Sequence, residues 1–263
     1  MERQAPRDRL SRPLVPVMKI DIRQVEYKEV MPFRELYRHE ANCQIVHDSS
    51  LSRGFGDTYL LSIDGRMAAY GAVFIKHYVG RLFEFYTLPY TRDHALPMFR
   101  ELLAASKATE IEAQSNMPLM LEMLNANGTE IVEESVLFQD FATTHLAGPT
   151  DGVRRFRQGD PVTNEGEPQG DWVLEVDGAV VANGGYLCHY NPPYGDIYME
   201  TAPEFRQKGH GSFLVQELKR ICYENGKKPG ARCNPTNVAS RRTLERAGFH
   251  AVGHMLAGKV AGA

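Results

Sequence analysis

The most informative segment of this chain reads Pro203-Glu204-Phe205-Arg206-Gln207-Lys208-Gly209-His210-Gly211-Ser212. It follows a predicted strand and leads at once into a predicted helix, 212–224, whose apolar residues recur at helical spacing. Backbone N–H groups at a helix start have no partner within the helix, and they bind anions with help from the helix dipole. Glycine lets the backbone wrap closely around such an anion. The segment therefore predicts a phosphate-binding turn, although a plain strand-to-helix turn uses glycines in the same way.

The same sequence plan occurs twice along the chain. Residues 59–74 and 172–187 each read as two alternating strands around an Asp-Gly pair, which is a strong hairpin signal. After each hairpin we expect a strand (83–92 and 197–206), a helix (96–107 and 212–224), a strand (110–114 and 230–234) and a last helix (118–126 and 238–247). The repeat predicts an α/β (α+β) chain of two related domains, each a mixed, mostly antiparallel twisted sheet flanked by helices.

Turn-forming residues at Gly148-Pro149-Thr150-Asp151-Gly152 suggest where the two domains meet. We expect a flexible arm over 1–18, a first domain over 19–148 and a second over 149–263. The arm is rich in Arg and Pro and has no apolar core, so it does not resemble a secretory signal.

The two halves differ at the glycine-rich turn. The first half has Arg92-Asp93-His94-Ala95-Leu96-Pro97 there, which lacks both glycines, adds an acid and loses an amide donor at the proline. Residues 206–246 hold ten Lys or Arg and three Glu, whereas 92–127 hold three Lys or Arg and five Asp or Glu. Only the second half is therefore expected to bind a phosphate, and its single basic face suggests a small polyanion rather than a long nucleic acid.

Composition excludes several other classes of protein. The chain has 263 residues, 43% hydrophobic and 24% charged, with a formal net charge of −3, which is typical of a globular protein and not of a basic nucleic-acid binder. No apolar run is long enough to predict a membrane-spanning helix. The four cysteines (Cys43, Cys188, Cys222 and Cys233) have no zinc-type spacing. We expect buried or free thiols, no metal site and a cytoplasmic location.

Two motifs of the second half resemble the GNAT superfamily of N-acetyltransferases. The turn matches the family pattern Arg/Gln-x-x-Gly-x-Gly/Ala, and the stretch 237–249 resembles Asn-x-x-Ser followed by Leu-Glu-x-x-Gly-Phe. The resemblance covers about 150–258 directly, and the first half resembles the same fold only through the repeat. It implies an acetyl-CoA-dependent enzyme in which an amine attacks the thioester directly in a ternary complex.

The resemblance also implies roles for particular residues. Backbone amides of the turn would hold the pyrophosphate, and strand groups at Met199 and Thr201 would face the pantetheine arm, where two parallel strands splay apart. Asn234 and Asn237 would lie near the thioester end. The implied acetyl-CoA-binding residues are Met199, Thr201, Arg206, Gln207, Lys208, Gly209, His210, Gly211, Ser212, Asn234 and Asn237. Arg241 or Arg242 could also reach a phosphate of CoA, or each could be a solvated helix charge.

The catalytic residues are less clearly marked. An ammonium group must lose a proton before it can attack, so a general base is needed, and Glu200 on the implied thioester strand is the first candidate. Asp196 and His189 are reserves, and Glu200 could instead be a structural carboxylate on the far face of the sheet. The family often has a tyrosine acid where this chain has Leu244, so Ser240 is the candidate acid, unless it is a small packed residue or the thiolate leaves unprotonated.

The acceptor site is expected at the cleft between the domains. The loop 188–195 is rich in aromatic residues and proline, and His189, Tyr190 and Tyr194 are candidate substrate-binding residues, or members of a packed loop. The second half has little helix-forming sequence before its hairpin, whereas the first half has a helical stretch around 32–44, so the first domain should supply part of the acceptor wall. The acceptor is a small-molecule or protein amine, with no nucleic acid or membrane partner.

Two other readings remain open at this stage. A CoA-binding regulatory protein without turnover would explain the missing tyrosine. An aminoacyl-tRNA-dependent transferase would need a basic surface on both halves, which the acidic stretch of the first half disfavours. The sequence leaves a monomer and a homodimer open.

Overall fold

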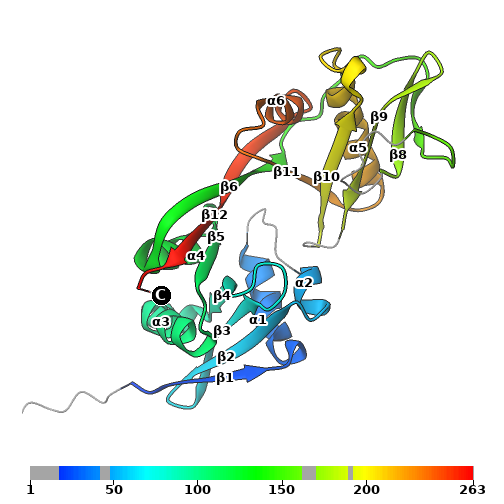
Figure 1. Cartoon of the computed structure of the whole chain (residues 1–263). Coiled ribbons are helices and arrows are strands. Elements are labelled where there is room, and N and C mark those ends of the chain that lie inside the picture. The colour runs from blue at the N-terminus through cyan, green and yellow to red at the C-terminus, as the bar shows by residue number, and fades with distance from the viewer. Residues whose placement is uncertain (1–17, 42–47, 162–169, 189–191, 263) are drawn as a thin grey trace, which may run out of the picture.

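The computed structural model describes residues 18–41, 48–161, 170–188 and 192–262, and their strands form one continuous sheet of twelve (Figure 1). The strands of the N-terminal half are β1 (Ile20–Val25), β2 (Gly56–Ile63), β3 (Arg66–Phe74), β4 (Arg81–Thr87), β5 (Glu110–Gln114) and β6 (Gly128–Asp140). Those of the C-terminal half are β7 (Gly152–Arg155), β8 (Trp172–Val176), β9 (Ala179–Leu187), β10 (Tyr194–Thr201), β11 (Lys228–Cys233) and β12 (Phe249–Val260).

Six α-helices and two short 3₁₀ turns accompany these strands in the described part of the chain. The helices are α1 (Tyr27–Glu40), α2 (Asp48–Ser52), α3 (Ala95–Ser106), α4 (Pro118–Asn127), α5 (His210–Glu224) and α6 (Val238–Arg246), and the 3₁₀ turns are η1 (Pro89–His94) and η2 (Pro203–Phe205). None of the described helices is both long and apolar enough to cross a membrane.

The two predicted hairpins are present, and their turns explain why the sequence showed them. Asp64 and Gly65 have φ angles of 48° and 76°, and Asp177 and Gly178 have 51° and 76°. Two successive positive φ angles are the geometry that Asp-Gly favours and that matches the twist of paired strands. The β2–β3 and β8–β9 pairs are antiparallel on either side of these turns.

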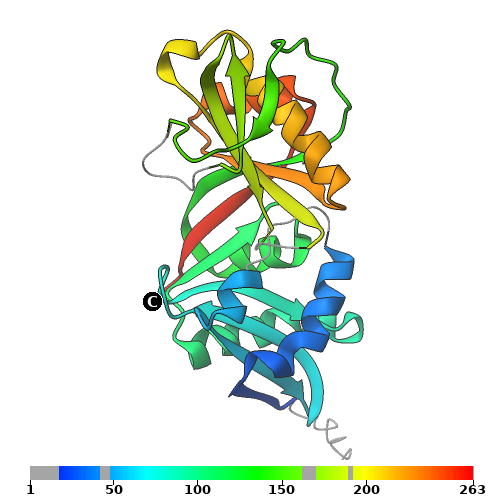
Figure 2. The ribbon, with the colours of Figure 1, turned by 90° about the vertical axis from the view of Figure 1, so that its right-hand side faces the viewer.

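The last strand of each half lies inside the other half. The strand order is β1-β2-β3-β4-β5-β12-β6-β11-β10-β9-β8-β7, so β12 separates β5 from β6, and β6 separates β12 from β11. The antiparallel β6–β12 pair runs through the waist of the molecule, where it joins the two halves (Figures 1 and 2). The sequence predicted two sheets, and the structure joins them into one. Whether 19–148 and 149–263 are independent domains stays a prediction.

Each half has its own hydrophobic core on one face of the sheet. In the N-terminal half, α3 and α4 bury Met98, Phe99 and Leu124 against β2–β5, and α1 packs Val30 and Tyr37 on the other face. In the C-terminal half, α5 and α6 bury a matching set of side chains against β6 and β8–β12. Residues 156–161 and 170–171, the described residues between β7 and β8, form no helix that could correspond to α1.

The buried cation Lys219 fastens the chain at the end of β6 to the C-terminal half. Its Nζ lies 2.6 Å from the Asp140 carboxylate and donates to the carbonyls of Ala142 (2.8 Å) and Ala247 (2.6 Å). Farther along the linker, the Leu146 amide donates to the Gln216 side chain at 2.7 Å. Helix α5 therefore holds both the exchanged strand and the end of α6.

Candidate functional site

The glycine-rich turn has the backbone geometry of an anion site. Helix α5 begins at His210, its first intrahelical bond runs from the Phe213 amide to the Gly209 carbonyl, and Gly209 is its N-cap. Among the described residues, the backbone amides from Gln207 to Ser212 donate to no backbone carbonyl. These amides are the orphan donors expected at a helix start, and a phosphate oxygen can accept from them.

The two glycines of the turn serve different purposes. Gly209 has a φ of 87°, which a residue with a side chain adopts only with strain. At Gly211 a Cβ would lie 2.7 Å from the Met199 side chain and 3.3 Å from that of Thr201, so glycine is needed for close packing of α5 on β10. Gln207 also has a positive φ, of 62°. The backbone reversal therefore depends on two left-handed residues and one close approach.

A cavity opens where the parallel strands β10 and β11 diverge. The two strands pair only from Tyr194–Ile197 to Lys228–Ala231, and no strand of the described chain fills the gap beyond. The cavity measures about 400 Å³. Four candidate residues, Met199, Glu200, Asn234 and Ser240, line it together with Ser135, Asn183, Leu187, Asp196, Ile197, Tyr198, Arg232, Cys233, Thr243 and Leu244. The expected splay is thus present, and it brings these candidate residues together.

Strand alternation decides which side of the sheet the candidate base faces. Ile197 and Met199 belong to the core beneath α5, so Glu200, like Asp196 and Tyr198, lies on the opposite face. The Glu200 carboxylate accepts a hydrogen bond of 2.7 Å from the Arg206 guanidinium, whose Nε also donates to the Thr201 carbonyl at 3.0 Å. Glu200 is therefore a cavity-lining carboxylate that is tied to the first residue of the glycine-rich turn.

Helix α6 begins beside the cavity, and its predicted residues have distinct places. The Asn237 side chain caps the helix by accepting from the Ser240 amide at 3.0 Å, and it is not among the cavity-lining residues. The Asn234 side chain accepts from the Thr236 amide and hydroxyl. Ser240 and Leu244 both line the cavity, so an apolar side chain stands where the family often has a tyrosine. What each does in binding or catalysis stays a prediction.

The thiols near the site are poorly suited to nucleophilic catalysis. Cys233 lines the cavity and belongs to the core, and burial raises the pKa of its thiol. Cys222 is fully buried, and burial raises the pKa of its thiol to about 12. Both remain protonated at neutral pH. Among the described residues no three metal-ligating side chains are grouped as a metal would need.

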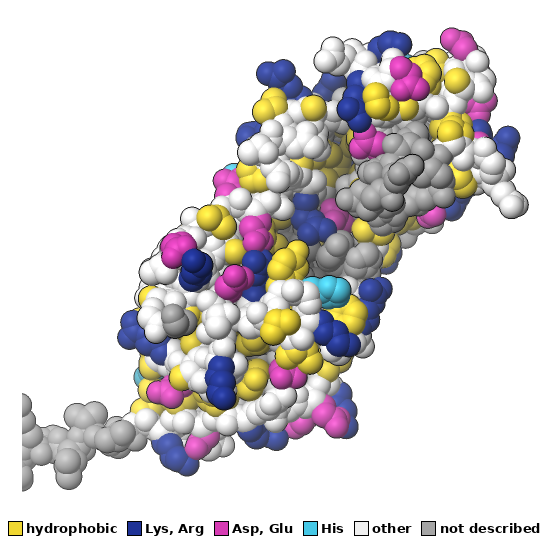
Figure 3. Space-filling view, viewed as in Figure 1, with side chains coloured by type: hydrophobic (Ala, Val, Ile, Leu, Met, Phe, Trp, Pro, Cys, Tyr) yellow, Lys and Arg dark blue, Asp and Glu magenta, His cyan; other side chains and the backbone are white. Residues whose placement is uncertain are grey.

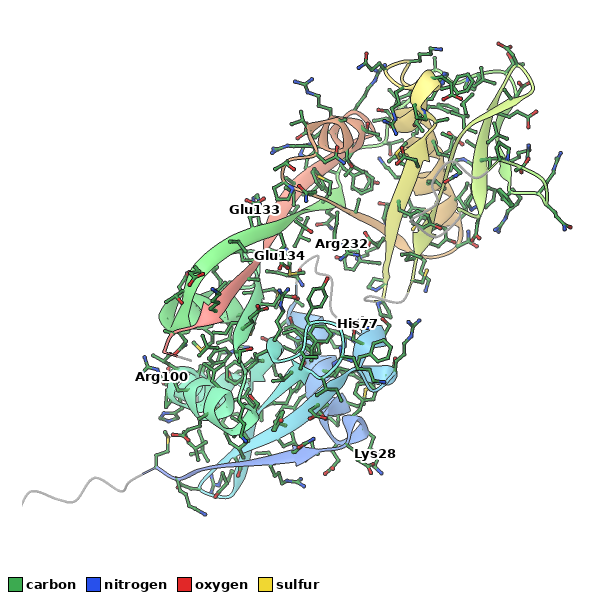
Figure 4. All side chains as sticks on the ribbon, viewed as in Figure 1. Lys28, His77, Arg100, Glu133, Glu134 and Arg232 are labelled. Atoms are coloured by element: carbon green, nitrogen blue, oxygen red, sulfur yellow. The ribbon has the colours of Figure 1, made fainter. Side chains whose placement is uncertain are left out.

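The cavity also carries a charged pair that joins the reserve base Asp196 to Arg232, a residue that the sequence analysis did not single out. Arg232 donates to the Asp196 carboxylate from Nε (3.1 Å) and Nη2 (2.8 Å). Figure 4 shows Arg232 on the side of β11 that faces the N-terminal half, and Figure 3 shows side chains of both charges at this waist. Of the predicted acceptor residues, Tyr194 begins β10 but does not line the cavity, while His189 and Tyr190 lie outside the described residues.

The corresponding place in the N-terminal half is filled. Strands β4 and β5 pair only at Arg81–Leu82 with Glu110–Ile111 and then diverge in the same way. There, the buried Arg34 of α1 donates to both oxygens of the Glu84 carboxylate at 2.9 and 2.8 Å, and Tyr70 donates to it at 3.0 Å. Burial and this carboxylate raise the pKa of Tyr70 well above its ordinary value. In the first half, the buried ion pair of Arg34 and Glu84 thus occupies the place where the second half has its cavity.

Comparisons with known proteins agree with this geometry. The family model described as "Acetyltransferase (GNAT) family" matches residues 137–249, which begin inside β6 and include the glycine-rich turn, the cavity strands and α6. No curated protein matches the sequence significantly. The evidence for the remainder of the chain therefore comes from solved structures.

Three solved structures resemble nearly the whole chain. A GNAT-family acetyltransferase from Colwellia psychrerythraea has a TM-score of 0.72 at 13% identity, covering 91% of this chain and 99% of that one. A tandem GNAT protein from the clavulanic acid biosynthesis pathway has 0.55 at 13% identity (93% and 100%), and a GCN5-related N-acetyltransferase from Sphaerobacter thermophilus has 0.55 at 16% (86% and 85%). At these identities they establish the fold. Together with the match over 137–249, they show that nearly the whole chain has the fold of GNAT structures and that its residues 137–249 resemble the GNAT acetyltransferase family.

Proposed function

We propose that this protein is an acetyl-CoA-dependent N-acetyltransferase with one working site, in its C-terminal half. Two features of the same half carry the proposal together. The backbone amides of 207–212 have no backbone acceptor, and a cavity opens between β10 and β11. The turn fits a diphosphate because its amides have no backbone acceptor, its glycines admit a close approach, and Arg206, Lys208 and His210 add polar side chains. The thioester end of the donor then falls in the gap between the strands.

Different residues would bind different parts of acetyl-CoA. The turn from Arg206 to Ser212 holds the diphosphate. The edges of β10 at Met199 and Thr201 offer backbone groups to the pantetheine arm, because β11 no longer pairs with them. Asn234 lies beside the thioester end, and Asn237 acts from behind it by fixing the start of α6.

Transfer follows direct attack in a ternary complex. Glu200 takes the proton from the substrate ammonium, directly or through water, and the amine nitrogen forms a bond to the acetyl carbonyl carbon. The nitrogen gives up its second proton to solvent as the carbon–sulfur bond breaks. The thiol sulfur leaves with its electron pair and is protonated by solvent, or by Ser240, which regains its proton from solvent. The amide groups of the β10 edge are placed to stabilise the negative charge that develops on the carbonyl oxygen.

We propose that the acceptor enters from the face of β10 that carries Asp196 and Tyr198, which looks toward the N-terminal half. Ser135 of β6 lines the same cavity, so the exchanged strand contributes to its wall. The acceptor is a small-molecule or protein amine, with no nucleic acid or membrane as partner, and the protein works in the cytoplasm as a monomer or homodimer.

Release of CoA thiol from acetyl-CoA in the presence of a panel of primary amines tests the function. Calorimetry with CoA is run in parallel on the same protein. Thiol release that depends on an amine supports the enzyme. Binding of CoA with no release from any amine favours the regulatory alternative. Absence of CoA binding rejects both.

A further inference from the structure

The end of α6 lies against the glycine-rich turn. A Cβ built on Gly209 would have its three nearest neighbours in the guanidinium of Arg246, with both terminal nitrogens at 3.7 Å and the central carbon at 3.8 Å. Arg246 is the last residue of α6 and is exposed, so its charge lies over the turn on the solvent side. A residue distant in sequence thus forms the second wall of the proposed anion site.

Arg246 is held in this position by the packing of its neighbours. Leu244 and Ala247 are buried in the core, and the Ala247 carbonyl accepts the 2.6 Å hydrogen bond from Lys219. Gly248 ends the helix with a φ of 92°. The backbone on both sides of Arg246 is therefore anchored to α5, the same helix whose first turn presents the amides.

The charges around the turn leave Arg246 available for an anion. Arg241 pairs with Glu245 at 2.9 Å, Arg206 pairs with Glu200, and Arg220 pairs with Glu217. Arg246 and Lys208 have no acidic partner among the described residues, and Lys208 lies 5.3 Å from the centre of the Phe205 ring. Two cations without an acidic partner among the described residues therefore lie at the turn whose amides have no backbone acceptor, which matches the two negative charges of a diphosphate diester.

We propose that Arg246 is a diphosphate-binding residue that adds its guanidinium to the anion site beside Gly209. This inference rests on the proposed use of the turn for acetyl-CoA. It assigns to Arg246 the diphosphate itself and not the 3′-phosphate of CoA, because the guanidinium lies at Gly209, in the middle of the amide run. A guanidinium can donate to two phosphate oxygens at once, so Arg246 should contribute more than a lysine would.

Calorimetric titration of CoA, dephospho-CoA and pantetheine into the protein tests the assignment. Hydrogen bonds between charged partners predict that Arg246→Ala weakens CoA and dephospho-CoA alike, by about 10- to 100-fold, and leaves pantetheine unchanged. Arg246→Lys should recover part of the loss. Arg220→Ala is the control, because Arg220 is likewise an exposed helix arginine but is paired with Glu217 and Glu224, and it should change the affinity for CoA by less than about threefold.

Several results would overturn the assignment. A loss in Arg246→Ala no larger than in Arg220→Ala removes Arg246 from the site. A loss seen with CoA but absent with dephospho-CoA moves the residue to the 3′-phosphate. Failure of the unaltered protein to bind CoA rejects the proposed function together with this inference, whereas normal CoA binding by Arg246→Ala rejects the inference alone. Circular dichroism of each variant checks that the fold is intact.

Discussion

Gly209 is the residue on which the geometry of the anion site depends most directly. Its φ of 87° disfavours any side chain, but the nearest atom to a built Cβ is 3.7 Å away, so alanine would meet strain without a clash. We expect Gly209→Ala to raise the KM for acetyl-CoA modestly. Gly209→Asp should raise it at least about tenfold more, because a carboxylate repels the diphosphate and can also neutralise Arg246. Steady-state kinetics measure both, and an unchanged KM in Gly209→Asp would contradict the site.

The proposed role of Glu200 as general base can be tested by a single substitution. Glu200→Gln keeps the shape of the side chain but removes the base, so kcat should fall by about 10²- to 10⁴-fold while the KM for acetyl-CoA changes little. Glu204→Gln is the control, since Glu204 is an exposed carboxylate of η2 close by in sequence. Equal kcat values for Glu200→Gln and the unaltered enzyme would point to another base, with Asp196 the next cavity-lining carboxylate.

The cysteines provide a prediction that follows from their pKa values. Burial raises the pKa of the Cys233 thiol, and it raises the pKa of the Cys222 thiol to about 12, whereas Cys188 is exposed just after β9. Since the thiolate is the reacting form, iodoacetamide at pH 8 should modify Cys188 well before either buried cysteine. Peptide mass mapping over time gives the order. Early alkylation of Cys233 would mean that the cavity exposes a reactive thiol.

For single residues, the sequence predicted those properties that depend on the residue type or on its immediate neighbours. The positive φ angles of the Asp-Gly turns and of Gly248 follow from residue type alone. Alternation alone indicated that Glu200 and Met199 point to opposite faces, but only the packing of α5 shows which face is which. The approach of Arg246 to Gly209 could not be predicted, because a contact between residues that are distant in the sequence leaves no signal in the sequence around either one. Arg232 and Tyr198 were missed for the same reason.

Among the elements, α5 is tied to the end of β6 and to the end of α6 by the buried charge of Lys219. Lys219→Met would leave Asp140 and two carbonyls without their cation, and breaking a buried pair typically costs about 3–5 kcal/mol of unfolding free energy. The neighbouring Arg220→Ala should cost about 1 kcal/mol or less, because its bridges to Glu217 and Glu224 are solvent-exposed. Chemical denaturation of the two variants compares these costs. Similar midpoints would show that Lys219 is not an anchor.

The elements themselves were predicted well where hydrophobic periodicity was strong. The strand 110–114 and the helices near 96–107 and 118–126 lie within a residue or two of β5, α3 and α4, and the stretch around 32–44 lies close to α1. The strands β6 and β12 were not predicted. Glu130, Glu133 and Glu134 interrupt the alternation of β6, and glycines interrupt that of β12. The burial of Lys219 was not predicted either, because it arises from the linker that covers it.

At the scale of the whole molecule, the exchange of strands predicts where the chain can be cut. A fragment 149–263 lacks β6, so β11 and β12 lose their shared partner, and Val136 and Phe138 leave the core. We expect it to aggregate. A fragment 128–263 keeps β6 and should remain soluble and bind CoA. Size-exclusion chromatography and calorimetry of both fragments decide the matter, and a well-folded 149–263 fragment would show that β6 is dispensable.

The overall plan was predicted in part. The repeat in the sequence indicated two halves of one design, because its signals lie in short contiguous stretches. That only the second half binds a phosphate stays a prediction. That the halves share a sheet was not predictable, since local pattern says that a strand forms but not which strand it pairs with. The location of the cavity wall on Ser135, a residue of the N-terminal half, depends on that pairing.

The crossing of β6 and β12 has a mechanical consequence. Two halves joined only by a flexible linker can rotate about a hinge and close on a substrate between them. Here such a rotation would shear the ladder of β6 with β12 and that of β12 with β5, which together span the waist. The shared sheet therefore fixes how the two halves stand to one another, so the acceptor amine proposed above would reach the cavity through movements of side chains and not through closure of one half on the other.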